Sequence, residues 1–155
     1  MRALAVVIPF LALAAYGCDA PLRPNDLPAP TFTVTPATVA PGDSFAVVFT
    51  LRNPTSRTMT ITSGSGCLFF LGAFRGSDAI PVEGLTYFCT ASISTFSIPP
   101  YHSLRFVQRA VAAERIGVGA SAPLSPGEYR IRTMMNAALP DVEATLTVVD
   151  ASGAT

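Results

Sequence analysis

The two-residue period of its apolar positions is what most constrains the fold of this chain. From residue 44 to residue 51, apolar side chains recur at every second position, namely Phe45, Val47, Phe49 and Leu51. That period is typical of a β-strand with one buried face. Fourteen Pro and eleven Gly in 155 residues interrupt the pattern so often that long helices have no room. We therefore expect an all-β domain of short strands joined by tight turns.

Eight or nine strands are expected, separated by turns that contain Pro and Gly. The segments with strand character are 31–35, 44–51, 57–62, 67–71, 85–90, 94–98, 103–111, 128–135 and 142–149. Segment 103–115 also fits a helix, because Leu104, Val107 and Val111 have near-helical spacing. The pattern contains no crossover helices, which parallel strands would need, so antiparallel pairing is expected.

The expected architecture is a single antiparallel β-sandwich over residues 31–150, followed by a flexible tail at 151–155. Residues two apart on a strand share a face, so the period also predicts the core. The side chains expected to face inward are Phe45, Val47, Phe49, Leu51, Met59, Ile61, Tyr129, Ile131, Leu146 and Val148. Thr50, one position from Phe49, is expected to face solvent.

The first seventeen residues are predicted to be an export signal. Met1 and Arg2 form a minimal basic start, and residues 3–15 are almost entirely apolar. This stretch is shorter than the ~20 residues of a membrane-spanning helix, but it has the length of a signal-peptide core. A buried N-terminal helix is the alternative, and Pro9 argues against it.

The end of this segment, Ala15-Tyr16-Gly17-Cys18, resembles the lipobox of bacterial lipoproteins. In that family the cysteine is diacylated and becomes the new N-terminus. The resemblance implies that Cys18 is lipidated and that its acyl chains anchor the protein to a membrane of the bacterial cell envelope, facing the periplasm or the cell surface. Ordinary cleavage after Gly17, which would release a secreted soluble protein, is the alternative, because Tyr16 stands where the family has a small residue.

The cysteine count supports lipidation. The chain has three cysteines, Cys18, Cys67 and Cys89, and an odd count leaves one thiol over in an exported protein. Lipidation of Cys18 accounts for that thiol, and Cys67 and Cys89 are then expected to form a disulfide in an oxidising compartment. Residues 18–30 contain four Pro and are expected to be a semi-extended tether between the anchor and the domain.

Three motifs between Phe45 and Val149 resemble the BsuPI-like family, small sandwich domains named after a bacterial intracellular proteinase inhibitor. Residues 51–56 match its L-x-N-x-[ST] strand end, residues 98–104 stand where it has L-x-P-G-x-S, and residues 124–131 match L-x-P-G-x-Y-x-[VI]. The resemblance implies an Ig-like sandwich. The last motif also resembles the tyrosine corner of Ig-like domains, which implies that the Tyr129 hydroxyl bonds back to the backbone.

Few residues suggest catalysis. His102 is the only histidine and lies in a proline-rich turn before Ser103, while the carboxylates are scattered far from it, so neither a Ser-His-Asp site nor a zinc site is expected. Sequence motifs of hydrolases, phosphate-binding loops and metalloproteases are absent, and no cofactor is expected. The net charge is zero, so no nucleic-acid partner is expected.

Two surface features are candidates for binding. Residues 72–84 form the longest irregular stretch, and Arg75, Ser77 and Asp78 within it make the candidate binding loop. Two pairs of arginines are each expected to share a strand face: Arg130 with Arg132, the candidate anion patch, and Arg105 with Arg109. For these pairs the alternative is the solvated outer face of the sandwich.

The sequence thus predicts a lipid-anchored, non-catalytic binding module of the bacterial envelope, whose partner is an envelope protein of unidentified kind. Proteinase inhibition, which the BsuPI-like resemblance implies, is the alternative. An envelope enzyme is a second alternative, for which the chain offers neither a second histidine nor a close carboxylate pair.

Overall fold

The computed structural model describes residues 29–85, 89–135 and 139–150, and these ranges contain only strands, turns and bends. The all-β prediction is therefore confirmed. The strands are β1 (Thr31–Thr35), β2 (Thr38–Val39), β3 (Ser44–Arg52), β4 (Met59–Ser63), β5 (Phe69–Arg75), β6 (Asp78–Ile80), β7 (Ser94–Ile98), β8 (Ser103–Val111), β9 (Ala113–Gly117), β10 (Ala120–Pro123), β11 (Gly127–Met135) and β12 (Glu143–Val148). Within these ranges no helix is long and apolar enough to cross a membrane.

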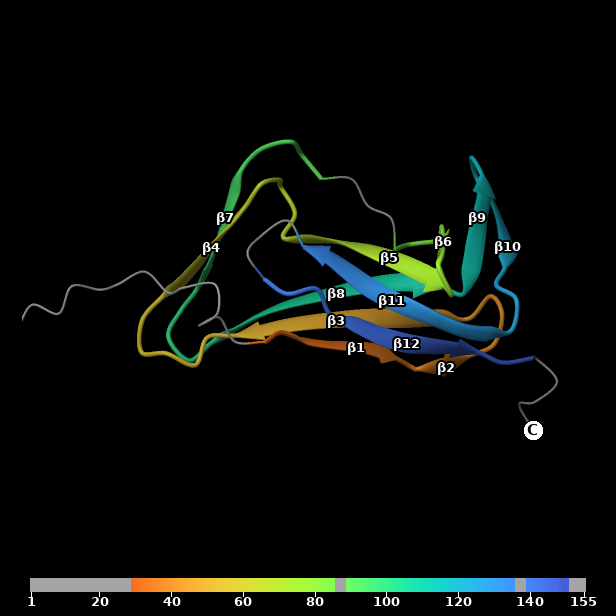
Figure 1. The fold of residues 1–155 in the computed structure, drawn as a ribbon, viewed down its shortest axis with the longest axis horizontal. Coiled ribbons are helices and arrows are strands. Elements are labelled where there is room, and N and C mark those ends of the chain that lie inside the picture. Colours follow the sequence, from red (N-terminus) through yellow and green to blue (C-terminus); the bar gives the residue numbers. More distant parts are fainter. Residues whose placement is uncertain (1–28, 86–88, 136–138, 151–155) are drawn as a thin grey trace, which may run out of the picture.

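Two sheets form the body of the molecule. One has three strands in the order β1-β3-β8, and the other has five in the order β2-β12-β11-β5-β6. Two further ribbons, β4-β7 and β9-β10, stand at opposite ends of the molecule in the view of Figure 1. The two large sheets pack face to face as a sandwich, with the apolar face of each strand turned inward.

The core lies between the two sheets and follows the sequence period. All ten side chains that the period places inside are buried: Phe45, Val47, Phe49, Leu51, Met59, Ile61, Tyr129, Ile131, Leu146 and Val148. Phe49 is 1% exposed, and its ring centroid lies 4.6 Å from that of Phe69 on β5, in the opposite sheet. Phe106 on β8 stands edge-on to Phe69 at 5.5 Å. These three rings join the sheets, because aromatic pairs at such distances attract each other beyond the area they bury.

Strand pairing differs from the expectation in one place. β2 pairs with β12 in parallel, whereas every other pair is antiparallel. The reason is that the chain leaves the first sheet after β1 and immediately joins the second sheet as β2. A two-residue strand that continues in nearly the same direction across the sandwich needs no crossover helix to run parallel to its neighbour.

The structure also decides the segments that were ambiguous in the sequence. Residues 103–111 form strand β8, so the helical alternative is wrong there. Of the predicted strand 85–90, Leu85 lies in a turn, residues 89 and 90 are irregular, and residues 86–88 lie outside the described ranges. Leu85 is nevertheless buried, which explains why the segment has the apolar character of a strand.

Two polar side chains fix the turns at the ends of the sandwich. The hydroxyl of Tyr129 donates a hydrogen bond of 2.7 Å to the carbonyl oxygen of Ser125, which is the tyrosine-corner bond that the Pro-Gly-x-Tyr motif implies. Asn53 is fully buried, and its Nδ2 donates to the carbonyl oxygens of Ile98 and Pro99 at 2.9 and 3.0 Å. Asn53 thereby ties the end of β3 to the turn before β8.

The predicted disulfide is present. Cys67 and Cys89 are bonded, with their Cα atoms 5.4 Å apart. Gly66 donates a backbone hydrogen bond of 2.8 Å to Thr90 beside it. The disulfide joins the segment just before β5 to the segment that leads into β7, so it ties the β4-β7 ribbon to the body of the sandwich.

Candidate functional site: the open edge at β8

The site begins with the backbone of β8, the outermost strand of the first sheet. β8 pairs with β3 over all nine of its residues, and no other described strand pairs with it. The N–H of Val111 points away from β3, because it donates to the carbonyl oxygen of Glu83 at 3.0 Å. Backbone groups alternate in direction along a strand, so the N–H and C=O groups of Arg105 and Val107 also point away from β3. β8 therefore presents unpaired backbone groups along a sheet edge.

One end of this edge is already covered. The segment Val82–Gly84 lies against the C-terminal end of β8, where Glu83 donates to the carbonyl oxygen of Ala113 at 2.8 Å. The side chain of Gln108 donates to the carbonyl oxygen of Gly84 at 2.7 Å. These bonds close the edge from about residue 109 onward, and no described residue pairs with the stretch around Arg105 and Val107.

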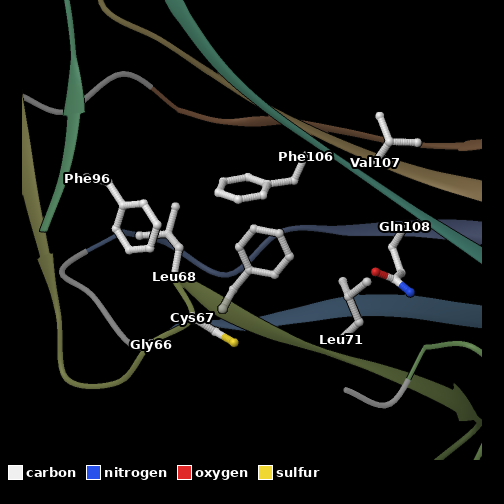
Figure 2. Close-up of a pocket in the computed structure, with 9 residues that line it drawn as sticks. Gly66, Cys67, Leu68, Leu71, Phe96, Phe106, Val107 and Gln108 are labelled. Carbon is white, nitrogen blue, oxygen red and sulfur yellow. The ribbon is translucent and has the colours of Figure 1, made fainter. Parts of the chain in front are cut away.

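An apolar cavity of about 170 Å³ lies on the inner side of this edge. Figure 2 shows it between β8 and the start of β5, with the rings of Phe96 and Phe106 near Leu68 and with Leu71 and Gln108 farther along. The described residues that line it are Gly66, Cys67, Leu68, Phe69, Leu71, Phe96, Phe106, Val107 and Gln108. Most of these side chains are aliphatic or aromatic, so the cavity suits apolar groups of moderate size.

The outer side of the same edge is basic. Arg105 and Arg109 are exposed on the outer face of β8 on either side of Val107, which is 45% exposed. Neither arginine forms an ion pair with a described carboxylate. The neighbouring strands contribute Val48 and threonines to this face. A hollow of about 420 Å³ beside Val107 and Arg109 has Glu83 at its rim as the one acidic lining residue among those described.

The candidate binding loop is a regular hairpin, so the interpretation of residues 72–84 as irregular is wrong. Arg75 pairs with Asp78 at the end of β5 and β6, and the two residues between them form the turn. Gly76 has φ 62° at the first turn position, which is the position where a type II′ hairpin turn favours glycine. Gly72 and Gly76 weaken the strand pattern in the sequence, so this two-stranded hairpin was predicted to be a loop.

The three candidate residues of this hairpin have different surroundings, and their role in binding stays a prediction. Arg75 reaches the neighbouring turn, where its Nη2 donates to the carbonyl oxygen of Pro126 at 3.0 Å, and its guanidinium lies 5.7 Å from the ring centre of Tyr129. Ser77 and Asp78 are exposed at the tip. Arg75 therefore holds the hairpin against the tyrosine corner.

The candidate anion patch shares one face, as expected, but each arginine already faces a carboxylate. Arg132 contacts Asp141 at 3.0 Å, and Arg130 lies 3.9 Å from Glu143 and donates to the carbonyl oxygen of Gly76 at 2.6 Å. Arg105 and Arg109 form no ion pair with a described carboxylate. The expectation that these two arginines share a strand face was the signal in the sequence for the site at β8, because which strand lies at an edge depends on the order of the whole sheet.

His102 and the cysteines complete the set of predicted residues. His102 is exposed, and its Nδ1 lies 2.7 Å from the carbonyl oxygen of Pro100, within its own turn. Cys67 lines the apolar cavity and is bonded to Cys89. Cys18 lies outside the described residues, so its lipidation stays a prediction. Within the described ranges, no three His, Cys, Asp or Glu residues gather in a way that could hold a metal ion.

Comparisons with known proteins add little to this geometry. No protein-family profile and no curated protein matches the chain. The solved structures similar to it include the β-glucosidase EmGH1 of Erythrobacter marinus, 16% identical with a TM-score of 0.47 over 79% of this chain and 15% of that one. A β-glucosidase of Listeria innocua is 8% identical, with a TM-score of 0.44 over 77% of this chain and 16% of its own.

A third similar structure is the alkylpurine DNA glycosylase AlkC of Pseudomonas fluorescens, which is 13% identical with a TM-score of 0.41. The alignment covers 77% of this chain and 30% of that one. This chain thus spans less than a third of each of these proteins, and similarity at this level carries no argument about its activity. The resemblance to the BsuPI-like family stays a prediction.

Proposed function

We propose that this chain is a lipid-anchored protein of the bacterial envelope whose sandwich binds another protein and catalyses no reaction. The observation that carries the binding proposal is the open edge of β8. Unpaired backbone groups, an apolar cavity on one side and unpaired arginines on the other form a surface that suits an extended polypeptide better than a small polar substrate.

The disulfide supports the anchoring part of the proposal. Cys67 and Cys89 are bonded to each other, so of the three cysteines only Cys18 is left over. Disulfides persist in oxidising compartments, which agrees with export from the cytoplasm. Two acyl chains on Cys18 would hold the domain at a membrane durably, because each buried CH₂ group contributes about 0.8 kcal/mol.

Metabolic labelling tests the anchor. A clickable palmitate analogue fed to a bacterial host that expresses the full chain is expected to label the wild type and not the Cys18→Ala variant. The label should fractionate with membranes. Unlabelled wild-type protein, recovered soluble from the periplasm, would contradict the lipoprotein proposal.

Site-specific cross-linking tests the binding part. A photoreactive residue placed at Val107 of the full chain in intact cells is expected to give a discrete adduct with an envelope protein. The matched control carries the same group at Thr145, which is exposed on β12 of the other sheet. Adducts of equal yield at both positions, or at neither, would argue against a binding surface at β8.

A further inference from the structure

We propose that β8 binds its partner by strand addition and that the partner segment is an extended peptide with acidic residues flanking an apolar stretch. This inference rests on the proposed binding function and specifies the chemistry of the partner. The inference is based on the surroundings of β8, which lies at a sheet edge without a described strand partner. An apolar cavity lies on the inner side of this edge, and two arginines that form no ion pair with a described carboxylate lie on its outer side.

The backbone of β8 sets the geometry of such a partner. The outward N–H and C=O groups of Arg105 and Val107 are spaced to pair with one additional strand. The bonds between Val82–Gly84 and the far end of β8 stop that strand near Arg109. A partner segment of about five residues therefore fits between the start of β8 and the covered end.

The outer side chains of β8 select acidic residues. Residues of an added strand that face outward lie opposite Arg105 and Val107, and the strand ends where Gly84 covers the backbone of Arg109. Opposite charges across a strand pair attract, so this face is satisfied by glutamate or aspartate opposite Arg105 and at the end of the strand nearest the Arg109 side chain, with a β-branched residue opposite Val107 between them. Glu83 lies at the rim of the hollow beside Arg109, so we expect the pair at Arg105 to contribute more than the pair at Arg109.

The inner side selects apolar residues. The two positions of the added strand that face inward lie opposite Phe106 and Gln108, above the cavity whose walls include Leu68, Leu71 and Phe96. Two leucine-sized side chains suit this volume better than polar ones, because the lining offers few polar partners. The preferred segment thus alternates acidic, apolar, β-branched, apolar and acidic residues, and it reads the same in both strand directions.

A second copy of this chain fits the edge poorly. Two β8 strands that pair antiparallel about Val107 would place Arg105 of each copy opposite Arg109 of the other. Like charges directly opposite each other are destabilising. Any pairing of two copies along this edge would also bring four arginines onto one face without a carboxylate to neutralise them, so the charge favours an acidic partner.

A synthetic peptide tests the proposal. The probe is a fluorescent nine-residue peptide whose central five residues are glutamate, leucine, valine, leucine and glutamate. A control peptide has lysine in place of both glutamates. Binding to the full chain in detergent, measured by fluorescence anisotropy, is expected for the acidic peptide and should be at least about tenfold weaker for the lysine peptide. The affinity of the acidic peptide should fall as salt is raised.

Two variants of β8 separate charge from backbone pairing. Arg105→Glu with Arg109→Glu is expected to reverse the preference, so that the lysine peptide binds better than the acidic one. Arg115→Glu, the same type of substitution at one exposed position on β9 and half the total charge change, should leave both affinities within about twofold. Val107→Pro removes one outward N–H and should abolish binding of either peptide, which a purely electrostatic surface would not show.

Hydrogen exchange supplies the decisive readout. The acidic peptide is expected to slow exchange of the Arg105 and Val107 amides and to leave that of exposed β11 residues unchanged. Binding without this protection, or protection by the lysine peptide alone, would overturn the proposal. If the acidic peptide fails to bind but a photoreactive group at Val107 still captures an envelope protein, the binding function stands and only the partner chemistry is wrong.

Discussion

Phe49 is a buried residue at the contact between the two sheets. Its ring is 1% exposed and packs against Phe69 of the opposite sheet and Phe106 of the neighbouring strand. Phe49→Ala is expected to lower the free energy of unfolding by about 3–5 kcal/mol, because it leaves a cavity in the core. Thr50→Ala, on the outer face one position along, should stay within about 0.5 kcal/mol. Urea unfolding of both variants measures the difference, and equal tolerance would mean that the register of β3 is wrong.

Asn53 is a polar residue on which the backbone of two strands depends. Its Nδ2 satisfies the carbonyl oxygens of Ile98 and Pro99, and its Oδ1 accepts from the N–H of Thr55 at 3.0 Å. Asn53→Ala is expected to cost about 2–3 kcal/mol, because buried carbonyl groups lose their donor. Asn53→Asp should cost at least as much, since it points a carboxylate at the same carbonyl oxygens. A smaller loss for Asp than for Ala, in chemical denaturation, would contradict this account.

For single residues, the sequence predicts which side chains are buried but not which hydrogen bonds a buried polar side chain makes. The two-residue period correctly predicted the burial of Phe49 and of nine other residues. The side of the sheet to which a side chain points depends only on its position along its own strand, so it can be predicted locally. Asn53 looked like an ordinary turn residue before Pro54. Two of its partners, Ile98 and Pro99, lie 45 and 46 residues away, and no local pattern encodes a contact at that distance.

At the scale of the elements, proline substitutions in β3 and β8 test whether β8 is an edge strand. Val107 and Val48 are opposite each other on the same outer face, but β3 is paired on both sides and β8 on one. Val48→Pro is expected to cost about 3 kcal/mol or more, because it removes a ladder hydrogen bond in a central strand. Val107→Pro should cost clearly less, since its N–H is unpaired. Thermal unfolding compares the two, and equal losses would show that the edge is not open.

The disulfide element is expected to stabilise the domain mainly by restricting the unfolded chain. Cys67 and Cys89 are 22 residues apart, for which the chain-entropy relation gives about 3.4 kcal/mol. The double variant Cys67→Ser with Cys89→Ser should therefore lower the melting temperature by several degrees. Cys18→Ser is the control and should leave it unchanged. A reduced protein that melts at the same temperature as the oxidised one would refute this contribution.

Elements with regular alternation were predicted well, and those that depend on distant pairing were not. β7 has the predicted bounds of residues 94–98, β3 is longer than predicted by one residue at its end, and β12 is shorter by one residue at each end. The hairpin of β5 and β6 was missed because Gly72 and Gly76 weaken the strand pattern on which the prediction relied. The irregular course of Leu85 was missed for the opposite reason, since burial alone gave it the composition of a strand.

For the whole molecule, the sequence predicted two stacked sheets but not their strand order. Strand order places β8 at an edge and makes β2 run parallel to β12. It also decides that Arg130 and Arg132 form ion pairs, whereas Arg105 and Arg109 form none with a described carboxylate. These are properties of residues far apart in the chain. The candidate site therefore became visible only with the fold, whereas the core was visible without it.

The two lateral sides of the first sheet differ in a way that limits how complexes can grow. β1, at the side opposite β8, has five residues and is flanked by Pro30 and Pro36, which offer no N–H to another strand. A strand received at β8 consequently cannot be followed by one received at β1. Continuous polymers need two complementary edges on every subunit, so growth along the first sheet should end at one partner per molecule. Such termination would prevent fibrous aggregates from growing by strand addition along this sheet.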